Sequence, residues 1–286
     1  MGRAAGERPP RARARTRRRQ ARARQRPHRH ERLPQGRDLG VGASVDRTAG
    51  IIVIGNEILS GKVVDTNSPF LTRELRALGV TVRRILTIPD ELDEIAAAVA
   101  QFHRDYDLVF TSGGVGPTHD DVTMEGVARG LDRRVIRHPA IADKIREYFR
   151  DKVNEARLKM SEVPEGAELI VDGRLGFPTI KCENIYILPG IPEILEQKFQ
   201  ALRDRFAVSP YFLRVVYTRE GEGAIAEHLN ATLAAFPELL LGSYPKIGDP
   251  DYAVKLTLES KDEGYVERAL AHLLGLLPEE AVVRTE

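Results

Sequence analysis

Three glycines and two adjacent aspartates form the most specific chemical feature of the sequence. The segment 111–121 reads TSGGVGPTHDD. Because glycine has no Cβ, such a loop can turn tightly and bring its backbone close to a ligand. Backbone N–H groups in a loop of this kind, followed by a helix N-terminus, form a concave anion site. We therefore predict that Gly113, Gly114, Gly116 and Thr118 bind a phosphate group. The alternative is a tight strand-to-helix turn without a ligand.

Asp120 and Asp121 add a second kind of chemistry to this loop. Two adjacent carboxylates repel an anion unless they hold a divalent cation or accept hydrogen bonds from the ligand. We expect both to be catalytic and to bind a divalent metal ion of the Mg, Mn or Co class. Asp121 has the alternative of capping the next helix with Thr123. His119 is predicted to be a ligand contact or a neutral surface residue rather than a nucleophile.

Further polar residues follow the first two predicted strands. Glu57 and Asp65 come after the first strand, and we expect them to reach the same metal ion. Asp90 comes after the second strand and is predicted to be a general base or a carboxylate that orients a donor. As a single residue it is equally typical of a helix N-cap. Gly55 and Asn67 are predicted to bind the ligand, the alternative being a solvated loop in which Asn67 caps a helix.

The elements that must position these residues alternate between strands and helices. Apolar, β-branched runs predict strands, and apolar residues at helical spacing predict the helices between them. The strands are expected at 50–55, 80–88, 107–111 and 179–188, and the helices at about 67–78, 91–102, 123–131, 141–159 and 193–206. This alternation predicts an α/β fold with a mainly parallel sheet. Ligands bind outside the carboxyl ends of such strands. The glycine loop, Gly55 and Asp90 fall at these ends. Pro189 and Gly190 follow the last predicted strand, and we include them in the predicted ligand site.

Three regions are expected along the chain: an extension at 1–46, the α/β domain at 47–207, and a small α+β unit at 208–286 with a β-α-β-β-α pattern. The extension is rich in arginine. Residues 1–40 hold fourteen arginines and three acids, a net charge of +11, whereas the remaining residues carry 29 basic and 39 acidic side chains, a net charge of −10. Such a tract cannot bury enough apolar surface to fold, so we expect disorder. One interpretation is that it is translated sequence upstream of the true start, for which Val45 is a candidate. The alternatives are a nucleic-acid arm and a targeting segment.

Composition excludes several other classes of protein. The 286 residues are 42% hydrophobic, enough for a core, and no apolar run reaches the roughly 20 residues that a membrane span needs. Cys182 is the only cysteine, so an intrachain disulfide is impossible. Zinc-type Cys/His spacing, a Walker-type lysine and a serine triad are missing. We expect a soluble cytoplasmic protein that does not bind membranes.

The loop that begins at Thr111, TSGGVGPTHDDVT, resembles the signature of the MoaB/MogA-like molybdopterin-binding fold. The wider set of matching segments is similar to the nucleotide-hydrolysing branch, meaning the N-terminal domain of CinA-type proteins and the molybdopterin-binding-like domain of eukaryotic FAD synthase. The resemblance covers about residues 49–286 and rests on these further segments: GNEILSG from Gly55, DTN from Asp65, FP from Phe177, LPGIPE from Leu188, LGSYP from Leu241 and YAVKLTL from Tyr252.

This resemblance implies a three-layer α/β/α domain that is often oligomeric. In cofactor-making relatives, the aspartates that match Asp90 and Asp121 serve at the pterin site. In the nucleotide-hydrolysing branch, the cleft is associated with metal-dependent cleavage of FAD-like or ADP-ribose-like pyrophosphates. Asn56 departs from the Asp or Thr that is common in relatives. The matched segments include no amidohydrolase or adenylyltransferase domain, so those activities are not expected.

Our main hypothesis is thus a metal-dependent dinucleotide pyrophosphatase whose small-molecule partner is a nucleotide. A molybdopterin adenylyl- or metal-transfer protein, which would bind a pterin without hydrolysing nucleotides, is the second hypothesis. A non-catalytic ligand-binding module is the third. The LGSYP region from Leu241 favours the first over the second, because simple pterin-transfer relatives lack such an appendage.

Overall fold

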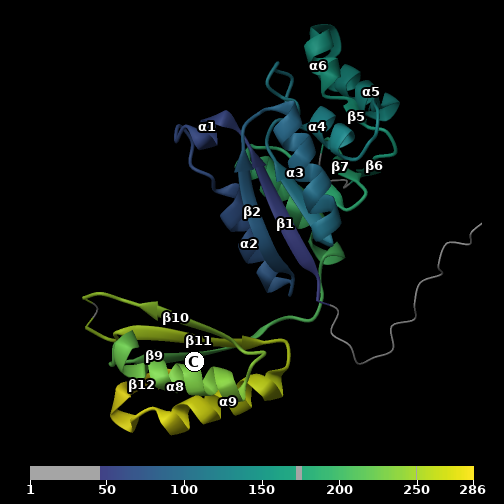
Figure 1. Ribbon diagram of the computed structural model, residues 1–286. Helices are drawn as coiled ribbons and strands as arrows, with labels where there is room; N and C mark the ends of the chain where they lie inside the picture. The colour runs from purple at the N-terminus through teal and green to yellow at the C-terminus, as the bar shows by residue number, and fades with distance from the viewer. Residues whose placement is uncertain (1–45, 172–175, 249) are drawn as a thin grey trace, which may run out of the picture. The chain divides into compact units, whose positions relative to one another are not determined.

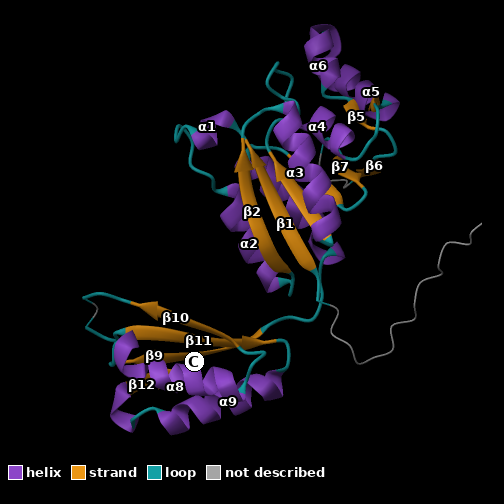
Figure 2. Cartoon of the chain, viewed as in Figure 1, coloured by secondary structure: helices purple, strands orange, loops and turns teal. Residues whose placement is uncertain are grey.

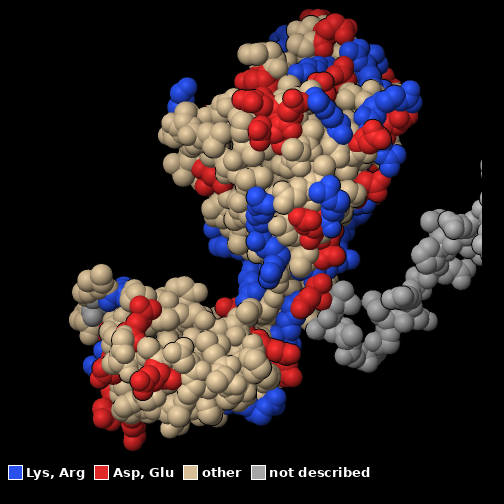
Figure 3. All heavy atoms as spheres, viewed as in Figure 1, with Lys and Arg blue, Asp and Glu red and all other residues tan. Residues whose placement is uncertain are grey.

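The computed structural model describes residues 46–171, 176–248 and 250–286. The predictions of a disordered tract and of an alternative start at Val45 therefore lie outside the described residues. The chain forms an α/β domain followed by an antiparallel sheet with its own helices (Figures 1 and 2). Acidic and basic side chains are interspersed over the visible surface of both (Figure 3).

The first domain is built on a six-stranded sheet in which four neighbouring strands are parallel. In spatial order the strands are β2 (Thr81–Ile88), β1 (Thr48–Ile54), β3 (Leu108–Ser112), β8 (Ile185–Leu188), β7 (Thr179–Cys182) and β6 (Glu168–Ile170). The last two pair antiparallel. The prediction of an α/β fold with a mainly parallel sheet is confirmed.

The single strand predicted at 179–188 is in fact the antiparallel pair β7 and β8. The chain reverses at Glu183, which adopts a φ of +52°. Asn184 fixes this reversal, because its side-chain amide donates to the carbonyl oxygens of His103 (3.2 Å) and Tyr106 (2.7 Å). Apolar residues stand on both sides of the two turn residues Glu183 and Asn184, so the segment reads as one strand in the sequence.

Helices cover both faces of the sheet and bury most of it. One apolar cluster joins the sheet to α2 (Asn67–Ala77) and α7 (Pro192–Leu202) through Leu71, Leu75 and Phe199. The other joins the opposite side chains of the sheet to α3 (Leu92–Asp105) and α4 (Thr123–Gly130), with Phe102 and Val127 fully buried. Successive strand residues point to opposite faces, which is why Ile51 and Ile52 belong to different clusters. The result is a three-layer α/β/α domain.

The charged helix predicted at 141–159 is broken into three pieces: α5 (Pro139–Phe149), the 3₁₀ turn η1 (Arg150–Lys152) and α6 (Glu155–Lys159). The break falls at Arg150, whose φ is +50°. A short antiparallel pair, β4 (Val135–Arg137) with β5 (Glu162–Pro164), frames this segment and is not predicted from the sequence. The remaining short elements of the domain are α1 (Asn56–Leu59) and η2 (Arg203–Arg205).

The C-terminal region is a four-stranded antiparallel sheet with two helices and a separate apolar core. Its elements in chain order are β9 (Phe212–Thr218), α8 (Glu222–Ala235), β10 (Leu240–Pro245), β11 (Val254–Ser260), α9 (Glu263–Leu276), η3 (Glu279–Ala281) and β12 (Val282–Thr285). The predicted β-α-β-β-α order is present, and β12 is added at the edge beside β9. Across the described ranges, the helices are all too short or too polar to span a bilayer.

Candidate functional site

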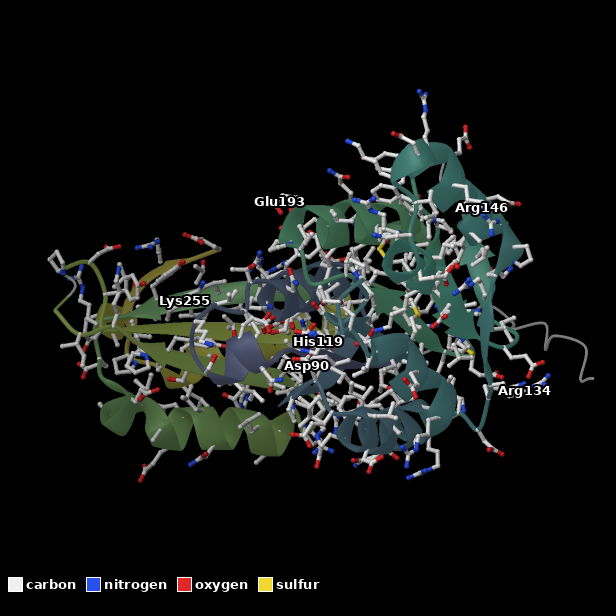
Figure 4. All side chains as sticks on the ribbon, turned by 90° about the horizontal axis from the view of Figure 1, so that it is seen from above. Asp90, His119, Arg134, Arg146, Glu193 and Lys255 are labelled. Atoms are coloured by element: carbon white, nitrogen blue, oxygen red, sulfur yellow. The ribbon has the colours of Figure 1, made fainter. Side chains whose placement is uncertain are left out.

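The four parallel strands end along one edge of the sheet. Paired residues at these ends include Ile54 with Ile88, and Ser112 with Leu188. The segments that leave this edge carry the predicted site residues, as the alternation of strands and helices requires. Figure 4 looks towards this end of the domain and labels Asp90 and His119, which follow β2 and β3.

Two positions of the glycine loop strongly favour glycine. Gly113 has a φ of +110°, and a Cβ there would lie 2.1 Å from the carbonyl oxygen of Ile54. Gly114 has a φ of +63°, and its Cβ would lie 2.3 Å from the hydroxyl oxygen of Thr123. Thr123 holds both residues: its hydroxyl donates to the Gly113 carbonyl (2.8 Å) and its N–H to the Gly114 carbonyl (3.0 Å). The loop is therefore fixed between the end of β1 and the start of α4.

The next feature of the loop is a run of unpaired amide groups. Among the described residues, the N–H groups of Gly114, Val115 and Gly116 donate to no protein acceptor. These three residues are partly buried. Successive N–H groups in a turn of this kind form an anion-binding concavity. This geometry suits a phosphate oxygen at Gly114 and Gly116, which stays a prediction. The predicted contacts of Gly113 and Thr118 are not available through their N–H groups, because these donate to the Leu188 carbonyl (3.3 Å) and to Asp121 (2.8 Å).

Asp121 shapes the far side of the loop rather than capping α4. One of its oxygens, Oδ2, accepts hydrogen bonds from the N–H (2.8 Å) and the hydroxyl of Thr118. The carboxylate lies against Gly116, where a Cβ would come within 2.7 Å of Oδ2. The N-cap of α4 is Val122, without a side-chain hydrogen bond, so the capping alternative is wrong. The Oδ1 atom of Asp121 has no hydrogen-bond partner among the described residues and is free for a ligand or cation.

Lys159 is a site residue that the sequence reasoning missed. From the end of α6, its Nζ donates to the carbonyl oxygens of Thr118 (2.9 Å) and Asp121 (2.8 Å). It lines a cavity of about 160 Å³ together with Gly114, Gly116 and Asp121. An ammonium group has three N–H donors, so one remains for a ligand. Because Lys159 lies 38 residues from Asp121 in the chain, no local motif links the two residues.

Asp90 faces the glycine loop from the end of β2. Its Oδ2 accepts the N–H of Asn56 at 2.8 Å, and its Oδ1 lies 3.6 Å from the position of a Cβ on Gly114. The N-cap of α3 is Glu91, again without a side-chain hydrogen bond, so the simple capping interpretation of Asp90 is wrong. The structure brings Asp90 beside the predicted phosphate site.

Asp65 and Asn67 tie the start of α2 to the sheet edge. Both oxygens of Asp65 are engaged by α2: Oδ1 accepts from the N–H groups of Asn67 and Ser68, each at 3.0 Å, and Oδ2 from the Ser68 hydroxyl. The Asn67 amide donates to the Ser112 hydroxyl (2.9 Å) and the Gly190 carbonyl (2.8 Å). Its Oδ1 is buried without a donor among the described residues. A buried acceptor left unpaired costs about 1–3 kcal/mol.

The four predicted metal ligands are not gathered by the protein alone. Glu57 is exposed on α1, and its carboxylate lies against Gly55. Asp120 is also exposed, and Asp65 binds the start of α2. Within 46–171, 176–248 and 250–286, no three His, Cys, Asp or Glu side chains lie close enough to hold a metal ion. Pro189 and Gly190 lie beside the loop, since a Cβ on Gly190 would be 3.3 Å from the Cα of Gly113.

Two known family models match successive parts of the chain. Residues 50–206 match the model of a probable molybdopterin binding domain. The chain belongs to this family. The molybdopterin-binding-type domain is followed by residues 210–286, which match the middle domain of FAD synthase.

Individual relatives support both assignments. A protein of Archaeoglobus fulgidus is 35% identical over 229 residues, which are 79% of this chain and 96% of the relative. A probable FAD synthase of Caenorhabditis briggsae is 34% identical over 259 residues, or 81% of this chain. The match spans 50% of that nematode protein's length.

A solved structure has the same fold as the molybdopterin-binding-type domain. The crystal structure of CinA from Thermoplasma acidophilum, described as a protein of unknown function, has a TM-score of 0.52 and 32% sequence identity. It covers 56% of this chain, and the match takes in 99% of the CinA chain. The predicted resemblance to the MoaB/Mog-like family and its CinA and FAD synthase branch is confirmed.

Proposed function

We propose that this chain hydrolyses the pyrophosphate bond of FAD-like or ADP-ribose-like dinucleotides with the help of a divalent metal ion. One observation carries the proposal. The unpaired N–H groups of Gly114, Val115 and Gly116 lie beside two carboxylates, Asp90 and Asp121, that each keep one oxygen without a partner in the described structure. A site with donors for a phosphate and carboxylates at its rim suits phosphoryl chemistry better than simple anion storage.

The residues present fit a divalent ion of the magnesium type better than a metal bound by protein ligands alone. Mg²⁺ usually takes one or two carboxylates and completes its shell with water and substrate phosphates. Asp121 through Oδ1 and the exposed Asp120 are the residues that would hold it. The ion would offset negative charge on the phosphate oxygens. Asp65 is left in a supporting role, because it already binds the N-terminus of α2. Glu57, which is exposed on α1, is also left in a supporting role.

The chain's own groups would then divide the remaining work. The loop amides would hold one phosphate and would stabilise the charge that develops on it. Lys159 adds a positive charge beside the loop, and its hydrogen bonds to the carbonyl oxygens of Thr118 and Asp121 hold these two residues in place. Asp90 would accept a proton from the attacking water at its Oδ1. The new P–O bond forms from water, the bridging P–O bond breaks, and two monophosphate esters leave.

The relatives are consistent with a ligand of this class. The C-terminal match is to the middle domain of FAD synthase, and two nematode relatives carry that enzyme's name. Synthesis of FAD is a transfer reaction, whereas our proposal concerns cleavage of a finished dinucleotide. We also propose that the chain forms a homo-oligomer in the cytoplasm, as the resemblance implies; light scattering of the purified protein measures its assembly.

A pterin ligand is the second candidate, favoured by the description of the family as a probable molybdopterin binding domain. It uses the same loop and predicts pterin binding without nucleotide cleavage. If the domain instead only binds ligands, nucleotide binding will occur without products.

The decisive experiment incubates the purified chain with FAD, ADP-ribose and NAD, each with Mg²⁺, Mn²⁺ or Co²⁺ and each with a chelator. Mass spectrometry identifies the products. We expect mononucleotide products that require the added ion. Intact dinucleotides under all conditions would refute the proposal, and tight pterin binding in the same preparation would then favour the second candidate.

A further inference from the structure

A second cavity, far larger than the one at the glycine loop, lies among α5, η1 and α6. Its volume is about 870 Å³, against about 160 Å³ beside the loop. Sites for whole small molecules usually measure about 300–1,000 Å³. The cavity at the loop is therefore too small for a complete dinucleotide. The larger one has room for a nucleoside and its phosphate.

The lining of this cavity is positively charged and poorly neutralised. Lys144, Arg150 and Lys152 line it, and none of them forms an ion pair within the described part of the chain. Arg157 adds a fourth cation, whereas Glu147 and Asp151 are the two acids of the lining. Cations without carboxylate partners are the usual means of binding a phosphate group. The two acids are suited to accept hydrogen bonds from ribose hydroxyls.

Aromatic side chains stand beside these cations. The Tyr148 side chain is 72% exposed although it is large and aromatic. Its ring is T-shaped to those of Phe149 and Phe177, with centroids 4.9 and 6.0 Å away. Arg157 lies 4.4 Å over the Phe149 ring. Exposed aromatic faces beside arginines are the arrangement on which nucleobases stack.

Arg150 occupies a backbone conformation that costs energy. Its φ of +50° is combined with a ψ of −119°, which lies outside the ordinary allowed regions for a non-glycine residue. Glycine would avoid this strain. Strained residues of this kind are concentrated at functional sites, and Arg150 lines the cavity.

The short helix α6 connects the two cavities. Arg157 of this helix lines the large cavity, and Lys159, two residues later, lines the cavity at the glycine loop. The helix is about 10–12 Å across, farther than two phosphates that share one bridging oxygen lie apart. A dinucleotide whose pyrophosphate lies at the loop therefore has no phosphate left for the large cavity, which suits a separate mononucleotide.

We propose that the cavity among α5, η1 and α6 binds a free nucleoside monophosphate, the product class of the proposed hydrolysis, with its base against Tyr148 and its phosphate among Arg150 and Lys152. This inference rests on the proposed function for its physiological meaning. Its test does not, because AMP has no pyrophosphate bond and can be measured without turnover or metal.

The charge contacts are tested by calorimetric titration of AMP into the metal-free full chain and into the variants Arg150→Gly and Lys152→Gln. We expect each variant to bind AMP about tenfold more weakly, the loss of one charge-assisted contact. Arg150→Gly should melt no earlier than the parent, since it relieves backbone strain. The matched control is Arg146→Gln, on α5 but paired with Asp143 at 2.8 Å and outside the lining; Figure 4 labels Arg146. The control should bind like the parent.

The stacking contact is tested with Tyr148→Ala and its conservative control Tyr148→Phe. Loss of one base–aromatic stack should weaken AMP binding about fivefold or more. The phenylalanine variant keeps the ring and should bind like the parent. Ribose 5-phosphate, which has no base, should bind the parent and Tyr148→Ala equally.

The outcomes separate this inference from the proposed function. If no dinucleotide is hydrolysed but AMP binding responds as described, the proposed function fails and the binding site stands. Failure of the parent to bind millimolar AMP, or parent-like affinity in Arg150→Gly and Lys152→Gln, would overturn the inference.

Discussion

The roles of individual aspartates depend on which of their oxygens the fold has already used. Both carboxylate oxygens of Asp65 accept hydrogen bonds from the N-terminus of α2. Asp90 and Asp121 each accept through one oxygen only, and the other oxygen has no partner among the described residues. Asp121 therefore has two functions, because the same carboxylate that shapes the loop through Thr118 still offers Oδ1. This division separates supporting from reactive carboxylates more clearly than their spacing in the sequence.

Substitution of Asp121 by asparagine is expected to abolish turnover and preserve the fold. The amide oxygen can still accept the Thr118 N–H, but the negative charge is lost. Removal of one electrostatic contact of this kind slows catalysis about 100-fold or more. Steady-state hydrolysis of FAD or ADP-ribose and the melting temperature are the two measurements. Asp143→Asn, whose side chain is exposed on α5, is the control with parent-like rates. Undiminished hydrolysis in Asp121→Asn would exclude this aspartate from the reaction.

At the scale of elements, the glycine loop is held by the ends of β1 and α4 and by Lys159 of α6. The loop therefore has little freedom to relax around an added side chain. The conformation of the loop depends on its packing contacts, so substitutions of uncharged residues in the loop should also disturb it.

Gly113→Ala is expected to destabilise the first domain by more than about 2 kcal/mol. The new methyl group would lie 2.1 Å from the Ile54 carbonyl, at a φ of +110°, where a non-glycine residue is strained. Gly176→Ala is the matched control, because no described atom lies within 4 Å of its added methyl and its φ is not in the left-handed region. Urea denaturation followed by circular dichroism compares the two. Equal midpoints would show that the loop is more adaptable than its contacts indicate.

Lys198 of α7 gives the structure a predictable alkaline response. Its Nζ is buried and donates to the carbonyl oxygens of Phe177 (2.9 Å) and Pro178 (2.8 Å), and burial lowers its pKa from 10.5 to about 8. Between these two values the unfolded chain binds a proton that the folded chain does not, so this group's contribution to stability rises with pH.

The free energy of unfolding of the parent, minus that of Lys198→Met, should therefore increase between pH 8 and 10.5, by up to about 3 kcal/mol. Methionine does not titrate, so the subtraction removes the other alkaline groups. Chemical denaturation at several pH values makes the measurement. A flat difference would show that Lys198 has an ordinary pKa in the folded protein, and a falling one that its pKa is raised.

At the scale of the whole molecule, the candidate site belongs to the molybdopterin-binding-type domain alone. Every residue assigned to the loop, the carboxylates and both cavities lies between 55 and 190. The C-terminal sheet and its helices have a separate core, with Leu256, Val266 and Leu273 fully buried.

A fragment of residues 46–207 is therefore expected to fold and to keep dinucleotide hydrolysis within about threefold of the full chain, because its core and site are complete. Size-exclusion chromatography, circular dichroism and the turnover assay test this. A folded but inactive fragment would show that the C-terminal region contributes to the site.

The sequence by itself determined the fold class, most of its elements and the edge of the sheet at which the site lies. These follow from local patterns, because the alternation of strands and helices fixes where parallel strands end and glycines mark where the backbone must turn. Only the tertiary structure decided that Lys159 holds the loop, that Asp65 serves α2 and that 179–188 forms two strands. Those facts depend on which groups meet in space, and a hydrogen bond formed across 38 residues leaves no periodic trace in the chain.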